Sequence, residues 1–226
     1  NAYMEYFTLN NYIGTSPSDK ETIWQSTEGF WPDPYTNPLY DVIGAPVLGN
    51  AQLTIVPSQE LVDAYDMLAT GKPVLNLEKP YLDEKHLSPN YNPGSGYNAD
   101  NPYEGRDPRF QATIFYNNSP VLLGNSSAFV ETYVGGNSEI RSSGNTNTRS
   151  GYYWRKRMVN GNCKAAGVAG YDGRFRFYRL GKIYLNLAEA AIESGHLNEG
   201  LALINTIRHR AGFAPAVDVT ASTKEG

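Results

Sequence analysis

The sequence predicts a mainly α-helical fold, in which one helical hairpin packs with a loop-rich, irregular region that contains a few short strands. Two observations favour this fold class. Apolar residues recur most regularly at helical spacing in residues 174–213, where Gly195 separates two periodic segments and Gly212 ends the second. The residues before this hairpin are rich in Tyr, Asn, Gly and Pro, a composition typical of turns and extended loops.

The composition indicates a folded protein and excludes several functional classes. The chain has 226 residues with 17 Tyr, 22 Gly and 14 Pro, and its formal net charge is −4. A nucleic-acid-binding face needs clustered Lys and Arg, so no nucleic-acid partner is expected. No apolar run reaches the roughly 18 residues of a membrane span. The single Cys163 excludes an internal disulfide, and neither a cofactor nor a metal site is expected.

We treat the chain as one partial region that divides into five segments. It opens on NAYMEYFTLNNYIGT without an initiator Met and ends on the polar run DVTASTKEG, so we expect a fragment trimmed at both ends. The segments are irregular aromatic-rich loops (1–57), a helix (58–71), a loop-rich stretch with short strands (72–173), the helical hairpin (174–213) and a polar tail (214–226).

The helix at 58–71 is predicted from one apolar stripe. Leu61, Tyr65 and Leu68 recur at i, i+4 and i+7, and Gly71 is expected to end the helix. Downstream, two apolar segments predict extended structure.

The run FQATIFY (110–116) predicts a short strand because it is β-branched and aromatic. The run SGYYWRKRMV (150–159), which contains GYYWRKRM at 151–158, predicts a second strand or extended segment. The three cations of the second segment, Arg155, Lys156 and Arg157, are expected on a solvated or ion-paired edge.

The hairpin resembles one tetratricopeptide-type unit, a pair of antiparallel helices with small residues where they cross. The small residues expected at the crossing are Ala188, Gly200 and Ala202. One such unit cannot bury its own apolar surface, so it must pack on further helices. The positions that match the repeat are Tyr184, Ala188, Gly195, Gly200, Ile204 and Ile207. The apolar face expected on the first helix comprises Leu180, Tyr184, Leu187, Ala188 and Ala191.

Four landmarks in this sequence resemble the SusD/RagB family of Bacteroidetes outer-membrane lipoproteins. The hairpin carries the family's AEA pattern at 188–190 after Arg179, then IN at 204–205, and then Arg208 and RAG at 210–212. Upstream, PSQELVDAYDMLATGKP (57–73) is similar to the family's acidic and aromatic helix. PYEGRDPRFQATIFYN (102–117) is similar to its RDPR turn, and GYYWRKRM (151–158) to its GY-x-x-RK segment. The landmarks spread over most of the chain, in the family's order.

The resemblance implies a non-catalytic binding protein. Members of the family sit on the cell surface above a TonB-dependent transporter of the SusC type and capture oligosaccharides, or in a minority peptides, for import. The fold implied is SusD-like, with tetratricopeptide units on one side and irregular loops on the other. This sequence lacks the family's lipid-modified N-terminal Cys, most of its tetratricopeptide helices and its final helical region, so a lipid anchor in the outer membrane is only implied.

The aromatic loops are the candidate ligand-binding elements. Flat rings match the C–H faces of sugars, and amides match their hydroxyl groups. The ligand-binding residues predicted on this basis are Trp24, Trp31, Tyr35, Asn37 and Tyr40 in one loop segment and Tyr91 and Tyr97 in another. The structural alternative for each residue is that its ring packs beneath a long loop.

Three other functions stay open at this point. A peptide-binding RagB-type protein would carry a different cargo, and a tetratricopeptide interaction module would bind protein on its helical face. A glycoside hydrolase would need two carboxylates at a set separation; the acids in or near the aromatic loops are Asp33, Asp41, Asp83 and Glu84.

Two charged groups are expected to be structural. In RDPR, Asp107 is predicted to cap a turn before Pro108 while the arginines bond nearby carbonyls. Glu189 is predicted to point inward and to pair with Arg179 or another arginine.

Overall fold

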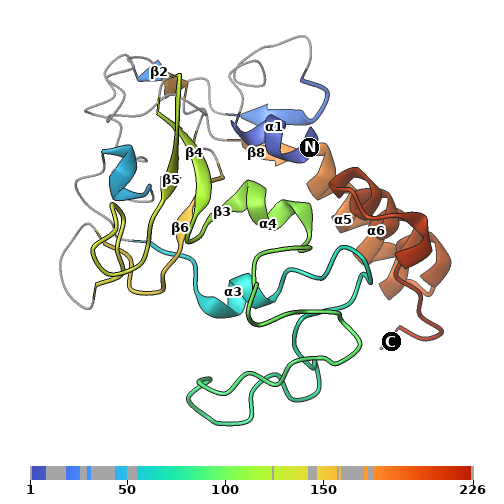
Figure 1. Cartoon of the computed structure of the whole chain (residues 1–226). Coiled ribbons are helices and arrows are strands. Elements are labelled where there is room, and N and C mark those ends of the chain that lie inside the picture. Colours follow the sequence, from blue (N-terminus) through green and yellow to red (C-terminus); the bar gives the residue numbers. More distant parts are fainter. Residues whose placement is uncertain are drawn as a thin grey trace. The chain divides into compact units, whose positions relative to one another are not determined.

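The structure is a computed structural model that describes residues 2–8, 19–25, 30–31, 44–49, 55–123, 125–141, 147–156, 158, 171–172 and 176–224 (Figure 1). The chain forms two compact units. The first comprises Asn1–Ala2, Glu60–Phe110 and Tyr178–Gly226, and the second comprises Tyr3–Gln59 and Gln111–Phe177. None of the described helices is long and apolar enough to cross a membrane.

Short helices and two- to five-residue strands precede the long helical hairpin along the chain. In chain order the described elements are α1 (Ala2–Thr8), β1 (Thr22–Gln25), β2 (Phe30–Trp31), η2 (Pro46–Leu48), α3 (Gln59–Asp63), α4 (Pro108–Thr113), β3 (Ile114–Phe115), β4 (Ser119–Leu123), β5 (Ser126–Val130), β6 (Tyr153–Trp154), β7 (Tyr171–Asp172), β8 (Arg176–Arg179), α5 (Leu180–Glu193), α6 (Leu197–Ala211) and η4 (Pro215–Val217).

The predicted hairpin is present as α5 and α6, which lie side by side at the red end of the chain (Figure 1). Gly195 adopts a left-handed backbone with φ 87° in the turn between them, and Gly212 caps α6 with φ 119°. The helices occupy less of the sequence than predicted, because residues 176–179 form β8.

The two helices pack most closely at Gly200. A Cβ at this position would lie 2.9 Å from the carbonyl oxygen of Ala188 and would overlap Cγ1 of Ile192. Gly200 is a poor helix former, but its missing Cβ lets α5 approach this closely. Ala188 is buried, as predicted, but Ala202 is exposed, so its predicted place at the crossing is wrong.

The predicted apolar face of α5 is split in two. Ala188 and Ala191 are buried, whereas Leu180 and Leu187 are exposed, together with Ile183 between them. These residues lie on one side of α5 as predicted, but α6 covers only the part with Ala188 and Ala191 and leaves the leucines exposed. A single tetratricopeptide-type unit leaves the other side open.

The predicted helix at 58–71 ends early, because α3 stops at Asp63 and turns follow. Arg106 supplies the hydrogen bonds that a longer helix would have made here. Its guanidinium donates to the carbonyls of Val62 (2.5 Å), Tyr65 (2.9 Å) and Pro102 (2.9 Å). The prediction that the arginines of the RDPR turn bond nearby carbonyls is confirmed for Arg106, whereas the side chain of Arg109 donates to the carboxylate of Asp107.

The predicted strand at 110–116 is wrong over most of its length. Pro108–Thr113 forms helix α4, and only Ile114–Phe115 is extended, as β3. Proline suits the first position of a helix, and Asp107 accepts a hydrogen bond from the backbone N–H of Arg109 at 2.8 Å. The capping role predicted for Asp107 is confirmed; what it caps is a helix.

The second unit is built from short two-stranded sheets. Strand β3 pairs antiparallel with β6, and β4 with β5, while β2 pairs with β7 and β1 with β8. The predicted strand at 151–158 is therefore limited to Tyr153–Trp154. The core behind these sheets consists of Ala45, Leu48, Phe115, Val121, Val130, Tyr153 and Met158.

Tyr153 ties this core to the loop that follows β5. Its hydroxyl donates to the carbonyl of Ser138 and accepts from the N–H of Thr148, both at 3.0 Å. Burial raises the pKa of Tyr153 to about 12, so the phenol stays protonated and keeps its donor at all physiological pH values.

A buried ion pair anchors α6 in the first unit. Nη1 of Arg208 donates to Asp66 at 3.0 Å, and Nη2 reaches the carbonyls of Gly71 and Val217 at 3.4 and 3.3 Å. The guanidinium also lies 4.1 Å from the ring centroid of Phe213. One side chain therefore links α6 to the turns after α3 and to η4.

Replacing Arg208 by Met should lower the free energy of unfolding by about 3 kcal/mol, because Asp66 would lose its partner in a largely shielded place. Chemical denaturation measures this loss. Lys224→Met is the matched control, since its pair with Glu193 is more than half exposed and should contribute less than about 0.5 kcal/mol. Equal losses for both variants would contradict the anchoring role of Arg208.

Replacing Gly200 by Ala should destabilise the hairpin by about 1–2 kcal/mol, although alanine is the better helix former by about 1 kcal/mol. The reason is the overlap of the added methyl group with Ile192 and the backbone of Ala188. Thr206→Ala, on the exposed side of α6, gains helix propensity but loses the hydrogen bond from the Thr206 hydroxyl to the carbonyl of Ala202, so it should change stability by less than about 0.7 kcal/mol. Thermal melts of both variants measure the difference. A more stable Gly200→Ala variant would show that the interface between α5 and α6 accommodates a methyl group at this position.

Candidate functional site

An exposed pair of aromatic rings in contact, tilted against each other, joins Trp24 of β1 and Phe177 of β8. Their ring centroids lie 4.6 Å apart with an interplanar angle of 32°. The exposed fraction is 57% for Trp24 and 44% for Phe177. Large rings that are half exposed and touch each other present an apolar surface to water.

Polar and aromatic contacts beneath this pair fix the two strands. Nε of Arg176 donates to Oγ1 of Thr22 at 3.1 Å, and the hydroxyl of Tyr6 lies 2.7 Å from the same oxygen. The guanidinium of Arg176 stacks over Tyr6, 4.3 Å from its centroid. Burial of Tyr6 raises the pKa of its phenol. The neighbours of Trp24 and Phe177 in sequence are thereby held together.

Of the predicted ligand residues, Trp24 is exposed as binding requires, and its role stays a prediction. Phe177 is not among the residues predicted from the sequence, because it falls in the segment 174–213 that the pattern assigns to helix. Its position next to Arg176 in an aromatic-rich run, RFRFYR, is the signal that marks it. Four other predicted residues have side chains outside the described part: Trp31, Tyr35, Asn37 and Tyr40.

The predicted pair Tyr91 and Tyr97 lies together in the first unit. Their ring centroids are 4.9 Å apart, and Tyr91 is 39% exposed. Tyr97 packs over the guanidinium of Arg106 at 5.5 Å and against the buried cluster around Val74. Burial raises the pKa of Tyr97 to about 12. Tyr91 can offer one face to a ligand, while Tyr97 acts mainly as its support.

The carboxylate of Asp83, one of the acids considered for a hydrolase, is hydrogen-bonded to the backbone of its own turn. Its carboxylate accepts from the backbone N–H groups of Lys85 (2.9 Å), Leu87 (3.2 Å) and Ser88 (2.5 Å). Desolvation acts to raise its pKa, but these hydrogen bonds outweigh it and the pKa is lowered. A carboxyl group with a lowered pKa is a poor proton donor, so this acid serves the loop.

Glu189 does not have the inward position predicted for it. Its side chain is exposed on α5, and the buried positions of that helix are Gly181, Ala188 and Ala191. The prediction is wrong because α6 packs on the opposite side of Glu189. Among the described residues, no cluster of three or more His, Cys, Asp or Glu side chains could hold a metal ion.

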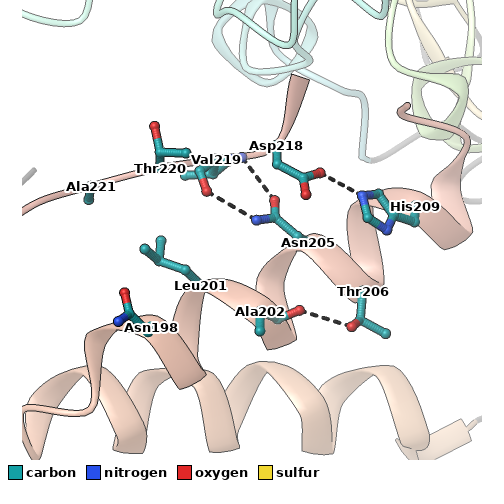
Figure 2. Close-up of a pocket in the computed structure, with 10 residues that line it drawn as sticks. All are labelled: Asn198, Leu201, Ala202, Asn205, Thr206, His209, Asp218, Val219, Thr220 and Ala221. Carbon is teal, nitrogen blue, oxygen red and sulfur yellow. Dashed lines mark hydrogen bonds and ion pairs between the residues drawn. The ribbon is translucent and has the colours of Figure 1, made fainter. Parts of the chain in front are cut away.

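A pocket of about 480 Å³ lies between α6 and the segment that follows η4 (Figure 2). Asn205 lies in the middle of the lining and donates to the carbonyl of Val219 and accepts from its N–H, at 3.0 and 2.9 Å. His209 lies at one end, with Nε2 2.5 Å from Asp218.

The ten lining residues are Asn198, Leu201, Ala202, Asn205, Thr206, His209, Asp218, Val219, Thr220 and Ala221. They include no Trp, Tyr or Phe, so the pocket offers hydrogen bonds without a flat ring.

Comparisons with known proteins agree with the sequence landmarks. The model of the SusD family matches residues 17–226. A solved SusD-like protein from Bacteroides fragilis is 25% identical, with a TM-score of 0.66 over 99% of this chain and 40% of its own. A second, a SusD-like carbohydrate binding protein from the same species, is 22% identical, with a TM-score of 0.67 over 99% of this chain and 39% of its own.

Among curated protein sequences, none matches the chain. This chain spans about 40% of the length of the two solved structures. The SusD-like fold class predicted from the sequence is confirmed. The chain belongs to the SusD family.

Proposed function

We propose that this chain forms part of a non-catalytic protein that binds oligosaccharides at the cell surface and passes them to a TonB-dependent, SusC-type transporter for import. The observation that carries the proposal is the half-exposed pair of touching rings, Trp24 and Phe177, in a chain of the SusD family. One of the solved structures with the same fold is described as a carbohydrate binding protein.

The chemistry of the ring pair suits a sugar. A pyranose ring presents axial C–H groups on one face, and these pack against flat aromatic surfaces, while its hydroxyls need donors and acceptors at the rim. Trp and Phe lose little side-chain entropy when a ligand covers them, because each has only two side-chain torsions. The contacts of Arg176, Thr22 and Tyr6 beneath the strands hold this surface ready before the ligand arrives.

The location follows from family membership. We assign the full-length protein to the outer membrane, lipid-anchored and facing outward, with a SusC-type barrel as its partner. No nucleic acid is among the partners proposed. A peptide cargo, as in RagB-type proteins, would use the same location and the same transporter class.

Catalysis is the less favoured alternative. A glycoside hydrolase places two carboxyl groups about 5–10 Å apart across the sugar. Next to β1, Asp19 uses its carboxylate to accept from the backbone N–H groups of Glu21 and Thr22, at 2.9 and 2.8 Å. This carboxylate orders the turn before Trp24, as Asp83 orders its own loop.

One observation favours an interaction module as a second function. The apolar side of α5 that carries Leu180, Ile183 and Leu187 is exposed by 40–50% at each residue. Tetratricopeptide helices cover such sides with further helices. Protein binding there would leave the ring pair unused, so the two functions are separable by mutation.

Replacing Trp24 or Phe177 by Ala should weaken oligosaccharide binding at least about tenfold, which corresponds to about 1.4 kcal/mol. A glycan array with the wild-type chain first identifies a ligand, and calorimetry then measures its dissociation constant for each variant. Phe129→Ala is the matched control, because Phe129 is 55% exposed in the same unit and should leave binding unchanged.

Two results would contradict the proposal. Unchanged affinity in both ring variants would remove the ring pair from the site. Release of new reducing ends from the bound oligosaccharide by the purified chain would show hydrolysis. Ile183→Asp, placed on the exposed side of α5, should leave glycan affinity unchanged; a loss there would favour the helical face.

A further inference from the structure

Three arginines of the described chain are almost completely buried: Arg106, Arg155 and Arg208, with 4%, 6% and 7% of their surface exposed. Each guanidinium carries five N–H donors and a charge that is costly to bury without acceptors. Arg106 has three backbone carbonyls. Arg208 has the carboxylate of Asp66 and two carbonyls, although its own Nε lacks an acceptor.

Arg155 differs from the other two because its side chain has no oxygen partner in the described residues. Its Nε is buried without an acceptor, and no described Asp or Glu pairs with it. The sequence predicted a solvated or ion-paired edge for Arg155, and for this residue that prediction is wrong. Its backbone follows β6, where its N–H donates to the carbonyl of Thr113 at 2.8 Å and holds the residue in the interior.

The surroundings of Arg155 stabilise a cation only weakly. Its guanidinium lies 5.2 Å from the ring centroid of Phe115, which is buried in the core of the second unit. Desolvation lowers the pKa of Arg155 to about 10, and only Tyr116 acts in the opposite direction. The group therefore stays charged at neutral pH while lacking the acceptors that its two counterparts have.

The next residue adds a second cation without a carboxylate. Nζ of Lys156 lies 4.5 Å from the ring centroid of Phe7 and 5.8 Å from that of Tyr3. In the described part of the chain Lys156 forms no ion pair either. Each of these two neighbouring cations therefore contacts aromatic rings and no described carboxylate.

We propose that Arg155 binds an oxyanion, specifically a carboxylate, through its terminal nitrogens. Of its three nitrogens only Nε is fully shielded and lacks an acceptor, so Nη1 and Nη2 are the ones that an incoming group reaches. A carboxylate matches two parallel N–H donors of a guanidinium in one plane, and Phe115 covers a face of that plane. The carboxylate comes either from a free small acid or from a uronic acid in a bound saccharide.

This site is separate from the proposed glycan surface, since it needs neither Trp24 nor Phe177. A failure of oligosaccharide binding leaves it intact, and its own failure leaves neutral-sugar binding intact. Only the uronic acid source would connect the two, by making acidic saccharides the cargo.

The test follows the Nε–Hε signal of Arg155 by proton–nitrogen NMR, with the wild-type chain at constant ionic strength. Arg155→Lys assigns the signal by its disappearance. Acetate and glucuronate should each shift it saturably, whereas neutral glucose should not. A dissociation constant at least about tenfold lower for glucuronate than for acetate would identify the saccharide as the source; equal constants would identify a free carboxylate.

Thermal melts give an independent readout. The wild-type chain should gain several degrees in Tm as acetate or glucuronate replaces chloride. Arg155→Met should lose this gain and, without carboxylate, should melt at the same or a higher temperature than wild type, because it removes an uncompensated buried charge. Arg149→Met, at an exposed arginine of the same unit, should keep the gain. An unmoved Arg155 signal with both acids, or equal stabilisation of Arg155→Met and wild type, would overturn the proposal.

Discussion

The hydrogen bonds from Arg106 to the carbonyls of Val62, Tyr65 and Pro102 show the constraint on which this structure depends. Backbone polar groups removed from water need partners, and a chain with little regular structure cannot supply them from its own ladders. Side chains take over that task. The guanidinium of Arg106 bonds both the end of α3 and the turn at Pro102. It thereby fixes the course of these loops in the first unit.

The same solution recurs wherever loops must be rigid. Asp83 accepts hydrogen bonds from three N–H groups of its turn, and the hydroxyl of Tyr153 bonds both Ser138 and Thr148. Asn205 bonds the N–H and the carbonyl of Val219. Rigid loops matter for recognition, because a ligand that meets a preformed surface loses little free energy in ordering it. Asp83, which the sequence left open as a candidate hydrolase acid, binds the backbone in this way.

Sequence patterns predicted the fold well where they were periodic or where a local motif had one meaning. The hairpin was predicted from residue spacing, the cap at Asp107 from a local motif, and the family from its resemblance to four sequence landmarks. The predicted strand at 110–116 was wrong because the apolar run begins within a helix that starts at Pro108. Burial was the least predictable property: Glu189 is outside and Arg155 inside, since both depend on which side a distant segment covers. For the candidate site, Trp24 is exposed, as the prediction of a ligand contact requires. Phe177 was missed because the segment that contains it was predicted to be helical.

The open side of α5 has a consequence for how the chain behaves in solution. Leu180, Ile183 and Leu187 expose apolar side chains along the first eight residues of α5. Two copies that meet along these side chains shield them from water, and the equilibrium between single and paired copies shifts with concentration. If copies pair in this way, the melting temperature of the chain depends on its concentration.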